Sequence, residues 1–478
     1  MLFKLPLYQD IPAPAGGAPA ILERLKALPC PFLLDTGMLV PGLGHHSFVG
    51  ADPFLVLKAR GQQITVSEGG KTIVYNGDPI VELGKLLDRY KLPAAPGPYP
   101  FNGGGVGYFS YDLGRSFEVL PSLAVDDLNT PDLRLGFYDV IVAVDVLSGE
   151  VTVISTGLPE RGPAAVIRAQ ERLVAVVELL AAQPIASAGA GVSARDSKVG
   201  ELVSNFTPDA YREAVRRAVE YIYAGDIFQV NLSQRFSTPQ VVDTWSLYTR
   251  LRQINPAPFA AFLSYDDLEV ISVSPERYMK LDGSRVETCP IKGTRPRGRT
   301  PEEDMLLRQE LLDSEKDRAE LMMIVDLERN DLGRVCEVGT VKVPELYRLE
   351  EYATVFHLVS TVEGKLYPEK DITDLLAASF PGGSITGAPK IRAMEIIEEM
   401  EPVRRGIYTG SIGYIGFDGR ADLNIVIRTI LAAQGNFYFQ VGGGITAESD
   451  PHQEYVETLD KARALVRALG LEKNGHGF

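Results

Sequence analysis

The sequence predicts a mixed α/β protein with two large subdomains or layers. The chain has 478 residues, which is more than one hydrophobic core usually organises. Its composition, 45% hydrophobic and 23% charged, is ordinary for a folded protein and indicates neither a fibre nor a disordered chain. Strand-like and helix-like segments alternate over most of the length, and no internal repeat is visible.

The N-terminal part, residues 1–182, is predicted to form a first region of mixed secondary structure. Alternating apolar residues predict strands at 62–66 and 71–77. Residues 139–156 predict a β-hairpin, because two runs of β-branched residues flank a Leu-Ser-Gly-Glu turn. A helix is expected from about residue 163 to 182.

Residues 183–204 are small and polar and lack an apolar period, which is typical of a linker. A second region, residues 205–470, is predicted to follow. Thr207 is a favourable N-cap and Pro208 a favourable first helical residue, so a helix is expected to begin there. Further strands are predicted at 268–276, 284–290, 410–417, 421–433 and 437–443, and further helices at 308–331, 388–401 and 454–469.

Charge and cysteine content limit the classes of function. The formal net charge of −15 argues against a general nucleic-acid binder and also disfavours an anionic substrate, unless local charge compensates. Three scattered cysteines are too few for a disulfide framework or a thiolate metal site, so a reducing cytoplasm is expected. No signal peptide and no apolar run of about 18 residues is visible, so no membrane segment is expected.

Two pairs of carboxylates have helical spacing. Asp317 and Glu320 are three residues apart, as are Glu454 and Glu457, so each pair shares one helix face. Oxygen donors without a neighbouring His or Cys cluster suit Mg²⁺ better than zinc. Taken alone, such pairs are more often solvated surface than metal ligands.

Two glycine-rich segments, 379–390 and 441–446, lie between strand-like and helix-like pieces. Such segments can offer backbone N–H groups to an anion, although tight turns are the more frequent case. Lys292 lies between Pro and Gly residues and is an ordinary exposed lysine unless burial lowers its pKa and makes the amine nucleophilic. Glu276 and His357, taken singly, are more often structural.

Together, these pieces resemble the chorismate-utilising enzymes, a family that includes the large subunits of anthranilate synthase and aminodeoxychorismate synthase. The resemblance spans nearly the whole chain. It is carried by FLLDTG (32–37), HHSFVGADPFLVLKARG (45–61), DIFQVNLSQRF (226–236), SPERY (274–278), PIKGTRPRG (290–298), AELMMIVDLERNDLGR (319–334), HLVSTVEG (357–364), FPGGSITGAPKIRAMEIIEE (380–399), RRGIYTGSIGYI (404–415) and GGGITAESDPHQEYVETLDKA (442–462).

The resemblance implies a two-layer α/β fold, with large antiparallel sheets forming a sandwich and helices outside, and chorismate bound with Mg²⁺. By motif position, Glu320 and Glu457 correspond to direct metal ligands, and Asp317 and Glu454 to companion carboxylates. A cation between these groups and the dianionic substrate would resolve the charge conflict. The expected substrate-binding residues are Gln229, Thr294, Tyr408, Arg428, the backbone of Gly442, Gly443 and Gly444, and Lys461 on the metal face.

The resemblance implies that the third residue of the PIxGT motif separates two types of enzyme within the family. Relatives of the anthranilate synthase type have alanine there, whereas aminodeoxychorismate synthases have lysine, as Lys292 here. The implied chemistry is attack of Lys292 on C2 of chorismate with loss of the C4 hydroxyl, followed by attack of ammonia on C4. Glu276 would be the general acid and His357 would orient the leaving group. Gln229 stands where water-adding relatives have a lysine base, so hydroxylation is disfavoured.

The resemblance therefore implies amination of chorismate at C4, for p-aminobenzoate and folate synthesis. Amination at C2, as in anthranilate synthase, and a non-catalytic subunit with the same fold are the alternatives. No glutaminase nucleophile motif surrounds any cysteine, so ammonia is expected from a separate glutaminase subunit. Relatives bind tryptophan in a regulatory pocket, and the corresponding residues here are Leu34, Asp35, Asn255, Pro256 and Phe259. The first of the two pocket segments is altered, so feedback inhibition is not expected.

Overall fold

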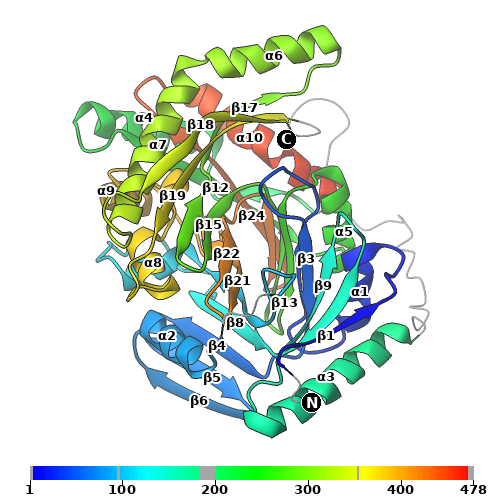
Figure 1. The fold of residues 1–478 in the computed structure, drawn as a ribbon. Helices are drawn as coiled ribbons and strands as arrows, with labels where there is room; N and C mark the ends of the chain where they lie inside the picture. Colours follow the sequence, from blue (N-terminus) through cyan, green and yellow to red (C-terminus); the bar gives the residue numbers. More distant parts are fainter. Residues whose placement is uncertain (1–3, 94–96, 183–199, 352–354, 472–478) are drawn as a thin grey trace.

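The computed structural model describes residues 4–93, 97–182, 200–351 and 355–471. Two large sheets face each other, and helices cover their outer sides (Figure 1). Every strand pair within these sheets is antiparallel. The predicted α/β sandwich with external helices is therefore confirmed.

The first sheet combines strands from both ends of the chain. In spatial order its strands are β1 (Leu7–Ile11), β10 (Val151–Ser155), β9 (Val140–Asp145), β3 (His46–Gly50), β2 (Phe32–Asp35), β13 (Phe259–Ser264), β14 (Leu268–Ser274), β23 (Thr429–Ala433), β24 (Asn436–Ile445), β12 (Gln229–Pro239) and β11 (Val203–Ser204), and β20 (Gly387–Ala388) also pairs with β12.

The second sheet is built in the same mixed way. Its strands are β17 (Ile291–Pro296), β19 (Val355–Lys365), β16 (Arg285–Thr288), β15 (Arg277–Asp282), β22 (Ala421–Asn424), β21 (Ser411–Gly416), β7 (Gly104–Phe109), β8 (Leu133–Tyr138), β4 (Leu55–Arg60), β5 (Gln63–Glu68) and β6 (Lys71–Asn76), and β18 (Lys342–Glu351) also pairs with β19.

Helices bury their apolar faces against the outer sides of the sheets. The helices are α1 (Gly17–Leu25), α2 (Pro79–Arg89), α3 (Gly162–Ala181), α4 (Pro208–Tyr223), α5 (Thr244–Ile254), α6 (Pro301–Asp313), α7 (Glu315–Gly333), α8 (Ile372–Ser379), α9 (Lys390–Met400) and α10 (Pro451–Leu469), with short 3₁₀ turns η1 (Tyr111–Ser116) and η2 (Gly383–Ile385). Helices α1, α3, α5 and α10 share one apolar core with the first sheet. No helix in the described part of the chain is long and apolar enough to cross a membrane.

A separate core lies between the two sheets. Phe48 of β3 packs edge-on against Tyr414 of β21, with ring centroids 5.7 Å apart, and Phe101 stacks on Tyr414 at 4.5 Å. Val270 of β14 is fully buried in the same cluster. Because these residues come from both sheets, their burial fixes how the sheets face each other.

The predicted boundary at 183–204 divides the sequence but not the sheets. Strand β2 pairs with β13 in the first sheet, and β7 pairs with β21 in the second, so strands from both predicted regions are hydrogen-bonded neighbours. The two regions thus share both sheets, and the apolar core on each sheet contains residues from both regions. Most of the predicted linker, residues 183–199, lies outside the described residues.

Several local predictions are confirmed. Strands β9 and β10 form the expected hairpin, and α3 matches the predicted helix. Thr207 caps α4, since its side chain accepts a hydrogen bond from the Ala210 N–H. Thr207 and Pro208 marked the start of α4 correctly, because the threonine side chain accepts a hydrogen bond from a free N–H of the first turn and the proline has no N–H that would need a partner.

Three local predictions were wrong in detail. The helix expected at 308–331 is two helices, because Ser314 has extended backbone and caps α7. The strand expected at 421–433 is β22 and β23, which lie in different sheets. The glycine segment 441–446 is not a turn: Gly442, Gly443 and Gly444 lie within β24 and pair with β12. A strand that crosses between layers, or one that carries glycines, has no distinctive apolar period.

Candidate active site

The site forms where the chain passes twice from one sheet to the other. Glu276 lies between β14 of the first sheet and β15 of the second, and Arg428 lies just before β23, after the chain leaves β22. The two crossings are adjacent, because the Ile425 N–H donates to the Glu276 carbonyl at 3.0 Å. Side chains at such crossings leave the regular alternation of a strand and can converge on one point.

Lys292 and Glu276 meet at Ser384 of η2. The Lys292 ammonium Nζ donates to the Ser384 carbonyl oxygen at 3.2 Å, and the Ser384 hydroxyl donates to Glu276 Oε1 at 2.6 Å. Asn231 Nδ2 also donates to the Ser384 carbonyl, at 2.9 Å. A single serine therefore positions both the amine and the carboxyl group.

A bulge in β17 orients Lys292. The register with β19 shifts between Lys292 and Thr294, and Gly293 at the shift has a φ of 77°. A Cβ at Gly293 would also lie 2.8 Å from Leu311 Cδ1 and 3.0 Å from the Asp317 side chain. Glycine is required there both for the left-handed backbone and for the close approach of the helices.

Burial shifts the pKa of both Lys292 and Glu276. Burial lowers the pKa of Lys292, although Glu320 and Glu276 act in the opposite direction. Burial raises the pKa of Glu276, although the hydrogen bond from Ser384 and the charge of Lys292 oppose this rise. Both pKa shifts are in the direction that a nucleophilic amine and a general acid need.

The four predicted carboxylates come from two helices that approach the same region. Burial raises the pKa of Glu320 on α7, and the negative charges of Asp317 and Glu457 raise it further, against the opposing charges of Lys292 and Lys316. The carboxylates of Glu454 and Glu457 on α10 flank Gly443: a Cβ there would lie 3.1 Å from Glu454 Oε2 and 3.4 Å from Glu457 Oε1. The helices therefore place acidic groups within electrostatic reach of one another.

Each carboxylate also contacts a neighbouring side chain, and for Glu320 this is Lys316 at 3.9 Å. Asp317 pairs with Arg295 at 3.1 Å, and Glu454 accepts a hydrogen bond from Ser449 at 2.6 Å. Burial opposes ionisation of Glu457, but Lys461, at 2.7 Å, outweighs it and lowers the pKa of Glu457. Carboxylate oxygens without a sulfur or imidazole ligand are the donor type that Mg²⁺ prefers, although among the described residues no three of these carboxylates place ligand atoms within 4.8 Å of one another.

Arg428 is a half-buried cation without an acidic partner among the described residues. Its backbone has a φ of 52°, a left-handed conformation that is uncommon for a long side chain and frequent at functional sites. Burial lowers the pKa of Arg428, and Tyr408 opposes this effect. An uncompensated guanidinium next to a tyrosine is suited to receive an anionic ligand.

His357, on β19, is close to Arg428. Burial lowers the pKa of His357 to about 4, and the charge of Arg428 contributes. The imidazole is therefore neutral at physiological pH, and its Nδ1 lies 2.9 Å from the Thr294 hydroxyl. A neutral histidine in this position can orient a hydroxyl group but is a poor cation.

The glycines of β24 open space next to Gln229. The Gln229 side chain is fully buried, and neither atom of its amide has a hydrogen-bond partner. A Cβ at Gly444 would lie 2.0 Å from Gln229 Nε2, and one at Gly442 would lie 2.4 Å from the Leu232 carbonyl oxygen. Buried polar groups are rarely left unpaired, so this amide marks a place for a polar ligand.

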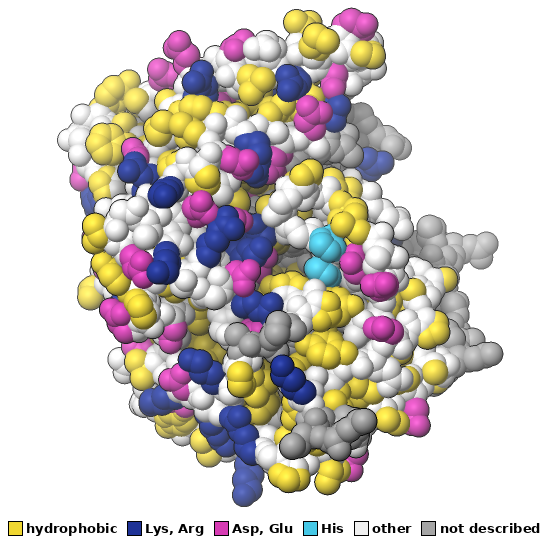
Figure 2. Space-filling model, viewed as in Figure 1, with side chains coloured by type: hydrophobic (Ala, Val, Ile, Leu, Met, Phe, Trp, Pro, Cys, Tyr) yellow, Lys and Arg dark blue, Asp and Glu magenta, His cyan; other side chains and the backbone are white. Residues whose placement is uncertain are grey.

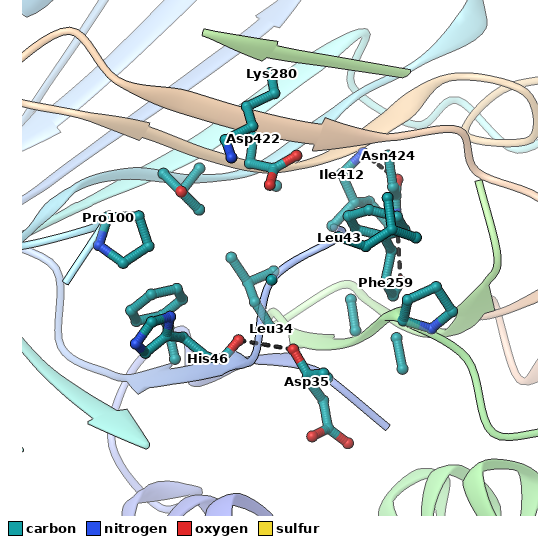
Figure 3. Close-up of a pocket in the computed structure, with 18 of the residues that line it drawn as sticks. Leu34, Asp35, Leu43, His46, Pro100, Phe259, Lys280, Ile412, Asp422 and Asn424 are labelled. Atoms are coloured by element: carbon teal, nitrogen blue, oxygen red, sulfur yellow. Dashed lines mark hydrogen bonds between the residues drawn. The ribbon is translucent and has the colours of Figure 1, made fainter. Parts of the chain in front are cut away.

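A cavity of about 100 Å³ lies between the sheets at part of the predicted tryptophan pocket (Figure 3). Leu34, Asp35 and Phe259 line the cavity, whereas Asn255 and Pro256 are not among its lining residues. The Asp35 carboxylate is bound by Tyr248 at 2.9 Å, by the Ser47 hydroxyl at 3.1 Å and by Arg252. Its charge is therefore already compensated by protein groups.

The structure places Lys292 within electrostatic reach of Glu276, Glu320, Glu457 and Lys461, and it pairs Thr294 with His357, which is close to Arg428. The four predicted metal-ligating carboxylates do not supply three ligand atoms within 4.8 Å of one another among the described residues. Sequence reasoning did not single out Ser384, Asn231 or the bulge at Gly293. The glycine-rich segment that contains Ser384 was visible, but a serine among glycines gives no signal of its own. Its role depends on two partners that are distant in sequence.

This α/β sandwich holds a lysine, a buried carboxyl group, several carboxylates and an arginine without an acidic partner in the described part of the chain. Such a set of side chains suits an enzyme that acts on a small anionic substrate. The chain belongs to the chorismate binding enzyme family, whose profile matches residues 46–467. It is 41% identical to aminodeoxychorismate synthase component 1 of Escherichia coli (strain K12) over 448 residues, which cover 94% of this chain and 95% of that protein.

Three further proteins are similar to this chain. Anthranilate synthase component 1 of Thermus thermophilus is 46% identical over 393 residues, which cover 82% of this chain and 83% of that protein. The crystal structure of anthranilate synthase component I from Streptococcus pneumoniae matches with a TM-score of 0.78 and 32% identity, covering 90% of this chain and 93% of that chain. The menaquinone-specific isochorismate synthase MenF of Escherichia coli shares the fold, with a TM-score of 0.70 at 17% identity, covering 98% of this chain and 97% of that chain.

Proposed function

We propose that this chain is the component of an aminodeoxychorismate synthase that converts chorismate and ammonia into 4-amino-4-deoxychorismate. Relatives with that name align over almost the full length of the chain. The observation that carries the proposal is the convergence of Lys292 and Glu276 on Ser384, which provides an amine and an acid in one site.

In the proposed reaction, the neutral Lys292 amine attacks C2 of chorismate. The ring double bond shifts, the C4–O bond breaks, and Glu276 donates a proton to the departing hydroxyl, which leaves as water. Ammonia then attacks C4, the double bond shifts back and the C2–N bond to Lys292 breaks. The overall balance is chorismate plus ammonia giving the C4 amine and water.

Substrate binding is assigned to polar groups near the two sheet crossings. Arg428 and Tyr408 would bind the side-chain carboxylate, assisted by the β24 glycines. Thr294 and His357 would orient the C4 hydroxyl, since they already form a hydrogen-bonded pair. Gln229 would hold a polar substrate group, because its amide is otherwise unsatisfied.

Glu320 and Glu457, with Asp317 and Glu454, would hold Mg²⁺. When bound, the ion would supply positive charge for the ring carboxylate of the substrate and withdraw electrons from the ring. Lys461, which donates to the Gly442 carbonyl at 2.9 Å, would keep Glu457 ionised and oriented.

The proposal includes a partner and a setting. A separate glutaminase subunit would supply ammonia, in line with the name "component 1" of the relatives. The complex would work in the cytoplasm and feed p-aminobenzoate and folate synthesis. The cavity lined by Leu34 and Phe259 would hold tryptophan as a structural ligand.

The test of this function is identification of the product. Incubation with chorismate, Mg²⁺ and ammonium, followed by addition of a lyase, is expected to give p-aminobenzoate, detected by chromatography and mass spectrometry. Accumulation of anthranilate without p-aminobenzoate would instead favour amination at C2. That second candidate has its own support in the similarity to the Thermus thermophilus anthranilate synthase component.

A variant of Ser384 tests the role of Glu276 through pH. Glu276 donates a proton only while protonated, so activity is expected to fall as the pH rises through its pKa. The Ser384 hydroxyl stabilises the carboxylate and lowers that pKa, so Ser384→Ala is expected to move the falling limb of the kcat profile to higher pH. A limb that stays in place, or moves to lower pH, contradicts the assignment.

A further inference from the structure

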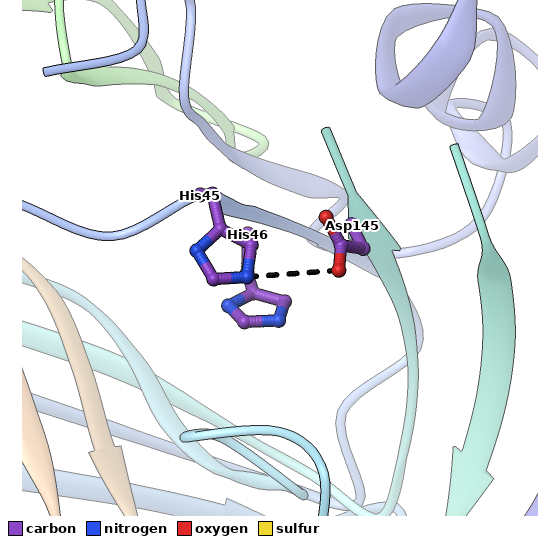
Figure 4. A group of neighbouring side chains, drawn as sticks. All are labelled: His45, His46 and Asp145. Atoms are coloured by element: carbon purple, nitrogen blue, oxygen red, sulfur yellow. Dashed lines mark ion pairs between the residues drawn. The ribbon is translucent and has the colours of Figure 1, made fainter. Parts of the chain in front are cut away.

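A second cluster of chemically active side chains lies outside the proposed active site. His45, His46 and Asp145 each place a ligand-type atom within 4.8 Å of the other two (Figure 4). His46 begins β3 and faces Asp145 of β9 in the strand register. The Val146 N–H also donates to the His45 carbonyl at 2.8 Å, so the ends of two paired strands fix the backbone of the cluster.

The side chains of the cluster are oriented by contacts that leave ligand atoms available. The two imidazole rings lie with centroids 4.2 Å apart. Asp145 Oδ1 accepts hydrogen bonds from the backbone N–H groups of Leu147 and Ser148, at 2.8 and 3.1 Å. The other oxygen, Oδ2, lies 3.6 Å from His45 Nε2. Backbone hydrogen bonds therefore fix Oδ1, and Oδ2 is available to a ligand.

The donor atoms of the cluster are of the type that zinc-class ions accept. They are two imidazole nitrogens and one carboxylate oxygen, all within 4.8 Å of one another.

We propose that His45, His46 and Asp145 bind a divalent transition-metal ion of the zinc class. Two imidazole nitrogens and one carboxylate oxygen suit Zn²⁺, Co²⁺ or Ni²⁺ and not Mg²⁺. Three protein ligands leave a fourth position for water or another ligand. The site is distinct from the carboxylates of α7 and α10, and it lies at the edge of the cavity that His45 and His46 line.

The site is open to solvent. The side chain of His45 is 38% exposed, and that of Asp145 is 19% exposed. On the face drawn in Figure 2, the visible histidine side chains lie beside acidic side chains at the surface. An ion can therefore enter without unfolding the strands, and its binding would tie the end of β3 to the end of β9.

Titration of the full chain with Co²⁺ tests the proposal, with excess Mg²⁺ present to occupy the carboxylate site. The wild-type protein is expected to bind one equivalent, with the visible absorption of a low-coordinate cobalt site that Zn²⁺ abolishes. Asp145→Asn should weaken binding at least ~10-fold, and so should His45→Ala. His452→Ala is the matched control, because His452 is exposed on α10, and it should bind as the wild type does.

Measuring the Tm of each variant with and without Zn²⁺ shows whether a loss of metal binding comes from a folding defect. Asparagine at position 145 can still accept the two hydrogen bonds of the turn, so Asp145→Asn should fold. Zn²⁺ is expected to raise the Tm of the wild type and of His452→Ala but not of Asp145→Asn. The proposal is overturned if the wild type binds no stoichiometric Co²⁺, or if all variants bind it equally.

Discussion

Lys292→Ala is expected to lower the rate of C4 amination by about 10³-fold or more, because it removes the group that forms the covalent bond to C2. The amine lies where burial lowers its pKa, close to a carboxyl group whose pKa burial raises. No other described lysine is bound to the Ser384 carbonyl in this way. The rate is measured as p-aminobenzoate formed from chorismate and ammonium with added lyase.

Two further variants separate a covalent role from an electrostatic one. Lys292→Arg keeps the positive charge but cannot become a neutral nucleophile, so it should be as inactive as the alanine variant. Lys342→Ala removes an exposed lysine from strand β18 and should retain full activity. Intact-protein mass spectrometry without ammonia should find chorismate less one water attached to the wild type only. Full C4 amination by Lys292→Ala would refute the covalent role.

Much of the fold was predictable where local chemistry decides the structure. The helix that begins after Thr207 and the hairpin of β9 and β10 depend on a cap and a turn, which short segments specify. The two-layer arrangement was predictable only through resemblance. Which strands are neighbours depends on pairs such as Asp35 with Ala260, and no local pattern encodes a pairing over that separation.

The site was predictable as a set of residues but not as a geometry. Motif positions identified Lys292, Glu276 and Arg428, yet nothing in the sequence shows that Ser384 joins the first two. The glycines of β24 were read as a turn, because glycine usually marks one. In the structure their missing side chains instead make room for Gln229 and the acidic groups of α10, a packing reason that only the folded chain reveals.

Glu276→Gln is expected to lower kcat for C4 amination by about 10²–10⁴-fold, the usual contribution of a general acid. Glutamine has nearly the same shape, and its carbonyl oxygen can still accept the hydrogen bond that Ser384 donates to Glu276. It cannot donate a carboxylic proton to the departing hydroxyl. The C4–O bond should therefore break slowly, so the attachment of chorismate to Lys292 should be lost along with turnover.

The comparison with Lys292→Ala locates the step that Glu276 serves. A group needed to expel the C4 hydroxyl must act before ammonia enters, so raising the ammonium concentration should not restore the activity of Glu276→Gln. Chorismate binding, measured by calorimetry with Mg²⁺, should remain within a few-fold of the wild type, because Arg428 and Tyr408 are unchanged. If Glu276→Gln still formed the Lys292 adduct at the wild-type rate, the acid would have to be another group. The neighbouring His357, neutral because burial lowers its pKa to about 4, is poorly suited to that task, which is why the assignment rests on Glu276.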